Sequence, residues 1–130
     1  MSFFNNLFGS SDQENTSKIA WRKLTDLGQL NELIELSHEK PVVIFKHSTR
    51  CSISRFALKQ FENDYDFSLE ELQSYFLDLL EYRSISNEVA SRFDVFHQSP
   101  QILIIKEGKS IFDASHDSIS VAEIKNVIKK

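Results

Sequence analysis

The chain reads VVIFKHSTRCSIS from Val42 to Ser54, and this stretch decides the fold. Its first four residues are β-branched or aromatic without a polar interruption, a run typical of a strand buried on both faces of a parallel sheet. Pro41 stands immediately before the run, so the preceding helix should end there. From about Cys51 the apolar residues recur at helical spacing, which predicts a helix. The residues expected to face the core are Ile53, Phe56, Ala57 and Phe61.

Strands and helices are predicted to alternate on both sides of this stretch. Further strands are expected at Ile19–Leu24, Gln73–Leu80, Gln101–Ile105 and Ser110–Phe112. Helices are expected after an N-cap at Asp26, around Val89, and after a capping box formed by Ser120 and Glu123. Their apolar stripes are Leu27, Leu30, Leu33 and Ile34, then Ile85, Val89 and Phe93, then Val121, Ile124, Val127 and Ile128. The order βαβαβαββα predicts an α/β thioredoxin-like fold, with a mixed central β-sheet flanked by helices.

Length and composition predict a single domain. The chain has 130 residues, of which 41% are hydrophobic, so one core and no second domain is expected, at residues 19–130. Residues 1–18 read as an appendage, either docked or mobile, whose Phe3, Phe4, Leu7 and Phe8 lie at helical spacing. Anchoring to a membrane surface or a partner is its alternative role, which the absence of Lys and Arg among the first ten residues weakens.

The charge pattern excludes some partners. The net charge is −4 and the charges are scattered, so no nucleic-acid partner is expected. The longest apolar runs have four residues, whereas a membrane helix needs about 20. One cysteine cannot form an internal disulfide, and no secretory signal precedes the domain, so we expect a cytoplasmic protein.

Cys51 is predicted to be the catalytic nucleophile, with Ser54 as the second catalytic residue. It stands where a central strand ends and a helix begins, and the N–H groups and dipole of a helix N-terminus favour a thiolate, the nucleophilic form. Arg50, Lys46 and His47 are expected to add positive potential. Ser54 occupies the place where dithiol oxidoreductases carry their second cysteine, and its hydroxyl can hydrogen-bond a thiolate but cannot resolve a mixed disulfide. A second thiol must therefore come from another molecule. The alternative is that Cys51 merely fills the core.

Pro100 is the second feature of the candidate site. Ser99 and Pro100 stand just before an apolar strand, where the thioredoxin order predicts a cis peptide bond, although a trans bond is the commoner state of an isolated X-Pro pair. The four histidines lack metal-ligand spacing, the three glycines form no phosphate loop, and Thr49 lies one residue too close to Cys51 for a peroxidatic motif.

With these residues in view, the chain resembles the monothiol bacilliredoxins, the YtxJ-like family, over residues 19–130. The resemblance is carried by Phe45–Ser54 (FKHSTRCSIS), Ser99–Gln101 (SPQ), Ala114–His116 (ASH) and Ile119–Ser120. The family usually has proline after the cysteine, and this chain has Ser52 instead, which removes a residue pre-organised for the first helical position.

The resemblance implies a function and a set of site residues. Cys51 would take bacillithiol from S-bacillithiolated client proteins, with bacillithiol as co-substrate and no bound cofactor or metal. Bacillithiol joins a cysteinyl amine to glucosamine and malate, so Arg50 or Arg55 would pair with the malate carboxylates and Asp117 with the amine. The predicted substrate-binding residues are Lys46, His47, Thr49, Arg50, Ser52, Ser99, Pro100, Ser115, His116 and Asp117.

Two alternatives remain open from the sequence. One is a monothiol glutaredoxin that uses another low-molecular-weight thiol or holds an iron–sulfur cluster between two chains, against which the missing glycines around Cys51 count. The other is a non-catalytic thioredoxin-like adaptor whose Phe-rich N-terminus binds a partner.

Overall fold

A computed structural model describes residues 19–129, so the predicted appendage at residues 1–18 lies outside the described residues. The strands are β1 (Arg22–Lys23), β2 (Val42–His47), β3 (Gln73–Asp78), β4 (Gln101–Lys106) and β5 (Lys109–Ser115). The helices are α2 (Leu27–Leu36), α3 (Ser52–Asp64), α4 (Arg83–Phe93), the short 3-10 helix η2 (His116–Ser118) and α5 (Val121–Ile128). None of these helices is both long and apolar enough to cross a membrane.

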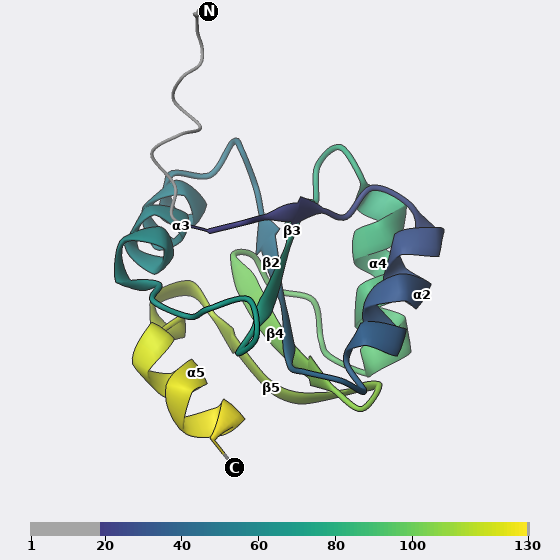
Figure 1. The fold of residues 1–130 in the computed structure, drawn as a ribbon. Helices are drawn as coiled ribbons and strands as arrows, with labels where there is room; N and C mark the ends of the chain where they lie inside the picture. Colours follow the sequence, from purple (N-terminus) through teal and green to yellow (C-terminus); the bar gives the residue numbers. More distant parts are fainter. Residues whose placement is uncertain (1–18, 130) are drawn as a thin grey trace, which may run out of the picture.

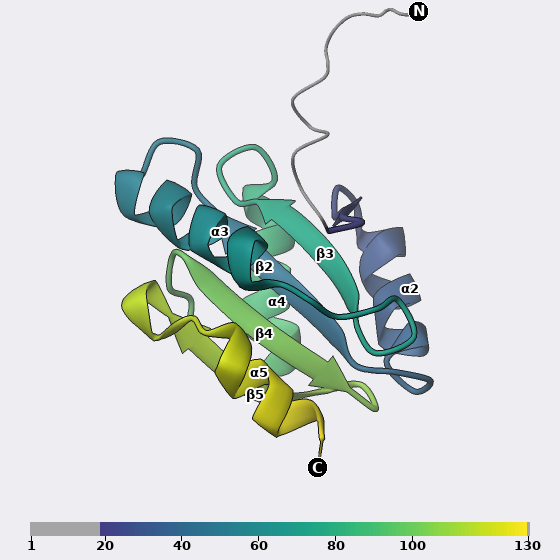
Figure 2. The same cartoon turned by 60° about the vertical axis from the view of Figure 1, so that its left-hand side comes forward.

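The five strands form one mixed sheet in the order β1-β3-β2-β4-β5. β2 lies parallel to β3 and antiparallel to β4, while β4 and β5 form the closing hairpin. Helices α3 and α5 cover one face of the sheet, and α2 and α4 cover the other (Figures 1 and 2). The α/β class, the mixed sheet and the order of its elements are therefore as predicted.

Two apolar clusters hold the helices to the two faces, and β2 contributes to both. Val43 and Phe45 pack with residues of α3 and α5, whereas Val42 and Ile44 pack with residues of α2 and α4. All six side chains of β2 are buried, because a central strand covered on both faces has no solvent-facing side. The alternation also fixes the next two residues: Lys46 points to the α4 face and His47 to the α3 face.

The first turn of α3 differs from the prediction. Ile53 and Phe56 were expected to face the core, but they are 59% and 72% exposed. Phe61 is nearly fully buried, as predicted, but the fully buried residue in the first turn is Ser54. The polar Ser54 takes the inward position because its hydroxyl bonds to the end of β2, and this rotates the two apolar side chains outward. The prediction for these two residues was wrong.

Other boundaries and caps are shifted. β1 has two residues rather than the six predicted, and Leu27 of α2 is half exposed rather than buried. The reciprocal capping box is found at Asp26 and Gln29, while Ser120 accepts from the backbone of Glu123 in a one-sided cap. These differences leave the position of the candidate site unchanged.

Candidate active site at Cys51

Cys51 is the N-cap of α3 and follows the carboxyl end of β2 by four residues. Its backbone is extended, its backbone N–H donates to the Ser48 carbonyl over 3.2 Å, and its carbonyl accepts from Arg55 N–H over 3.0 Å. Cys51 is partly exposed, and its side chain makes no capping bond to the helix. The positive end of the helix dipole favours an anionic sulfur at this position. No acidic side chain lies in the first turn of α3 to oppose this effect.

Ser54 connects this helix to the end of β2. Its Oγ lies 2.7 Å from His47 Nδ1 and accepts from the Ser48 backbone N–H over 3.0 Å. Burial lowers the pKa of His47, with Arg55 adding to the effect, and Asp78 and Glu62 oppose it only in part. His47 is therefore neutral at neutral pH, and its hydrogen bond with Ser54 fixes the loop that presents Cys51.

Lys46 lies on the opposite face of the sheet and has no exposed surface. Its Nζ donates to the Ser86 carbonyl of α4 over 3.4 Å and lies 3.3 Å from His97 Nδ1. Burial lowers its pKa to about 8. Burial likewise lowers the pKa of His97, with smaller effects from the positive charges of Lys46 and Arg83. A side chain in this position acts on a ligand only through other residues.

Ser99 and Pro100 lie at the same end of the sheet, since Lys46 pairs with Gln101, the residue after the proline. The peptide bond between them is cis, which confirms the prediction. Ser99 Oγ is buried and has no hydrogen-bond partner among the described residues. The Pro100 carbonyl accepts from the backbone N–H of His116 over 3.0 Å, which ties η2 to this segment.

The remaining predicted residues form the exposed part of the site. Thr49, Arg50 and Ser52 surround Cys51 at the surface, and Arg55 Nη1 donates to the Thr49 carbonyl over 3.2 Å. η2 packs against α3. Beside it, a groove of about 690 Å³ is lined by residues that include Gln98, Ser115, His116 and Asp117. These two groups are the solvent-accessible part of the predicted site.

Three residues that contact or pair with Lys46 were not among the predicted site residues: His97, Ser86 and Gln101. His97 stands only three residues before Pro100, which is the one signal that pointed to it. The residues that the structure describes contain no group of three or more His, Cys, Asp or Glu side chains that could hold a metal ion.

A family model described as monothiol bacilliredoxin BrxC matches residues 22–124. The chain belongs to this family. The match includes Cys51, Ser54 and the Ser99–Pro100 pair, so the resemblance predicted from the sequence is confirmed.

Solved structures agree on the fold. A structure described as a proposed oxidoreductase with a thioredoxin fold is 28% identical, covers 82% of this chain and 92% of its own, and superposes with a TM-score of 0.70. The thioredoxin Mala s 13 of Malassezia sympodialis is 18% identical, with 88% and 92% coverage and a TM-score of 0.67. A Schistosoma mansoni thioredoxin is 20% identical, with 84% and 93% coverage and a TM-score of 0.62. Family and fold together support a thiol redox role for this bacilliredoxin.

Proposed function

We propose that this bacilliredoxin removes bacillithiol from mixed disulfides on client proteins by thiol–disulfide exchange at Cys51. The observation that carries the proposal is the pairing of Cys51, partly exposed at a helix N-terminus, with a fully buried serine at the place of a second cysteine. Ser54 offers no second thiol, so a mixed disulfide on Cys51 can be resolved only by a thiol from outside.

The exchange takes place in two balanced steps. The Cys51 thiolate attacks the bacillithiol sulfur of the mixed disulfide, an S–S bond forms between Cys51 and bacillithiol, and the client sulfur leaves as a thiolate that takes up a proton. A second bacillithiol thiolate then attacks the bacillithiol sulfur bound to Cys51. This step releases the Cys51 thiolate and bacillithiol disulfide. The reaction needs a reducing thiol pool, so we assign it to the cytoplasm.

The site residues divide the work of binding bacillithiol. Arg50 and Arg55 are exposed beside Cys51 and suit the two malate carboxylates, because guanidinium groups bind carboxylates in bidentate fashion. Asp117 in the neighbouring groove suits the cysteinyl amine. The backbone of Ser99 is proposed to bind the cysteinyl part, while Thr49, Ser52, Ser115 and His116 line the surface around it.

Mass spectrometry of Cys51 tests the proposal. The protein is incubated with a client carrying a bacillithiol disulfide, and the expected result is a bacillithiol adduct on Cys51 together with a free client thiol. Cys51→Ser is the matched control and should leave the client capped. A parallel client capped with glutathione separates the proposed thiol from other small thiols: faster release from the glutathione client, or no adduct on Cys51, contradicts the proposal.

A further inference from the structure

A polar cluster lies on the α4 face of the sheet, at the end nearest Cys51. It comprises Lys46, Gln101, Ser86 and His97. Lys46 and Gln101 are direct partners across β2 and β4, so their side chains leave the same face of the sheet. Both are almost fully buried, with exposed fractions of 0% and 1%. Farther along, this face of the sheet is apolar.

Lys46 is energetically unfavourable at this buried position. A buried ammonium loses its hydration, and proteins usually compensate with a carboxylate partner. Within residues 19–129, Lys46 has no ion pair, and its polar contacts are the Ser86 carbonyl and His97 Nδ1. An apolar side chain of similar length would fill the same space at lower cost. The cost is therefore better explained by what Lys46 holds than by fold stability.

What the cluster holds is the segment Phe96–Ser99. Lys46 Nζ contacts the ring of His97. Gln101 makes two hydrogen bonds to the segment: its Nε2 donates to the Phe96 carbonyl over 3.0 Å, and its Oε1 accepts from the backbone N–H of Gln98 over 3.4 Å. The segment has little apolar anchorage of its own, since Phe96 is 86% exposed. It runs directly into the cis Ser99–Pro100 bond beside the candidate site.

We propose that Lys46 is a positioning residue, which acts through His97 to hold the Phe96–Ser99 segment so that the Ser99 backbone is ready to meet an incoming disulfide. This inference rests on the proposed exchange at Cys51. His97 is the titratable group that contacts Lys46, and the positive charge of Arg83 from α4 acts on His97; neither of them is an acid. Lys46 and His97 therefore meet as ammonium donor and neutral imidazole acceptor, a contact that weakens when Lys46 loses its proton.

The test compares four variants for order in the segment and for exchange. Lys46→Met removes the donor. His97→Ala removes the acceptor at an exposed position where folding is not at stake, and His97→Gln keeps an acceptor. Lys46→Met combined with His97→Ala measures the coupling. Loss of one charge-assisted hydrogen bond corresponds to a change of about tenfold in an equilibrium constant. Lys46→Met and His97→Ala should therefore each raise the KM for a bacillithiolated client about tenfold. The KM of the double variant should be no higher than that of either single variant. His97→Gln should restore the KM to near the parent value.

Amide hydrogen exchange of Phe96–Ser99 gives a readout that does not depend on bacillithiol. Lys46→Met should lower the protection of these amides against hydrogen exchange and leave β2 protected. In the parent protein, the protection of the same amides should fall in a similar way above about pH 8, the pKa of Lys46. Unchanged protection in Lys46→Met, or additive effects in the double variant, overturns the positioning role. If the parent protein releases no bacillithiol while the protection changes as expected, the proposed function fails and the positioning role stands.

Discussion

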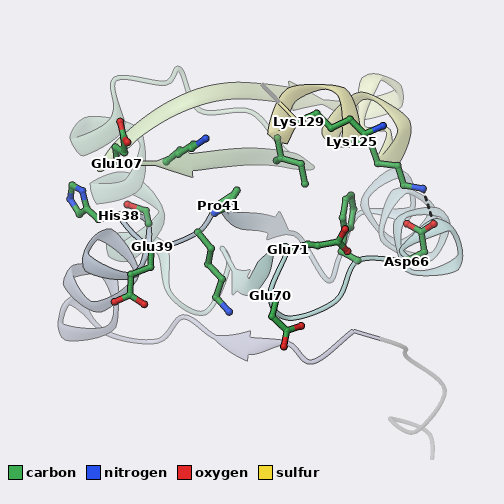
Figure 3. Close-up of a pocket in the computed structure, with 14 residues that line it drawn as sticks. His38, Glu39, Pro41, Asp66, Glu70, Glu71, Glu107, Lys125 and Lys129 are labelled. Carbon is green, nitrogen blue, oxygen red and sulfur yellow. Dashed lines mark hydrogen bonds and ion pairs between the residues drawn. The ribbon is translucent and has the colours of Figure 1, made fainter.

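The two ends of the sheet differ in what they expose. The end where β2 finishes carries Cys51, and the open groove beside η2 at this end is not lined by Cys51 itself. The end where β2 begins carries a cavity of about 560 Å³ between Pro41, the 66–71 loop, the β4–β5 turn and α5 (Figure 3). Charges of both signs line it, and Lys125 and Asp66 neutralise one another over 2.7 Å. No cysteine lies there.

The comparison shows that a cavity alone does not identify this site, because the groove beside η2 at the Cys51 end and the cavity at the opposite end are similar in size. A disulfide on a client protein has to approach a nucleophilic sulfur from outside, so an open surface suits the exchange better than an enclosed pocket. At the Cys51 end, charge and hydrogen bonding are arranged beneath the surface, by His47 on one face of the sheet and Lys46 on the other.

Lys46→Met should have the largest effect on stability, and in the stabilising direction. The pKa of Lys46 is about 8 in the folded protein against 10.5 in the unfolded chain, which corresponds to a cost of about 3 kcal/mol at neutral pH. Between these values the unfolded chain binds more protons, so the stability of the parent protein rises with pH. The gain from Lys46→Met should therefore be greatest below pH 8 and shrink toward pH 10.5. Urea unfolding of both proteins across this range measures it, and a gain independent of pH contradicts the assignment.

Ser54→Ala should have the next largest effect, in the opposite direction. The change leaves His47 Nδ1 and the Ser48 N–H buried without their partner, which should cost about 2 kcal/mol. Ser86→Ala is a matched control, because Ser86 is equally buried but its Oγ has no partner among the described residues. That variant should unfold within about 0.5 kcal/mol of the parent protein. Equal losses in the two variants would show that Ser54 only fills space.

Lys46 and Ser54 also show which parts of the site could be predicted from the sequence. The apolar run Val42–Phe45 and the order of elements were enough to predict the sheet and the place of Cys51, because burial on both faces leaves a clear pattern. The orientation of the first turn of α3 was not predictable, because a hydrogen bond from Ser54 to His47 outweighs the apolar stripe of Ile53 and Phe56. That bond joins two elements, and periodicity within one helix carries no record of it.

The contacts of Lys46 were hidden for a similar reason. The sequence placed it among the substrate-binding residues, since it stands five residues before Cys51. Strand alternation directs its side chain to the far face, and the pairing with Gln101 then brings it beneath His97. Register between strands decides this contact, and register is a property of the folded sheet.

Ser52→Pro should have a smaller, stabilising effect at the Cys51 end. Ser52 is the first helical residue of α3, where proline fits because the backbone N–H has no partner within the helix. The restricted unfolded chain should add about 0.5 to 1 kcal/mol to the free energy of unfolding. The rate of Cys51 alkylation at fixed pH shows whether the lost N–H matters to the sulfur. We expect a change of less than about threefold, because the other first-turn N–H groups remain. A larger fall in the alkylation rate would show that the Ser52 N–H contributes to the reactivity of Cys51.

Lys125→Ala should have the smallest effect, and it tests the opposite end of the sheet. The change breaks the ion pair with Asp66, whose partners are 42% and 56% exposed, so water screens most of its energy. The expected loss is at most about 0.5 kcal/mol in urea unfolding, and it should fall further as salt is added. Release of bacillithiol from a client should keep the parent rate, since Lys125 pairs with Asp66 at the end of the sheet opposite Cys51. A slower release at unchanged stability would show that the charged cavity contributes to the exchange reaction. It would contradict the assignment of the reaction to the Cys51 end of the sheet alone.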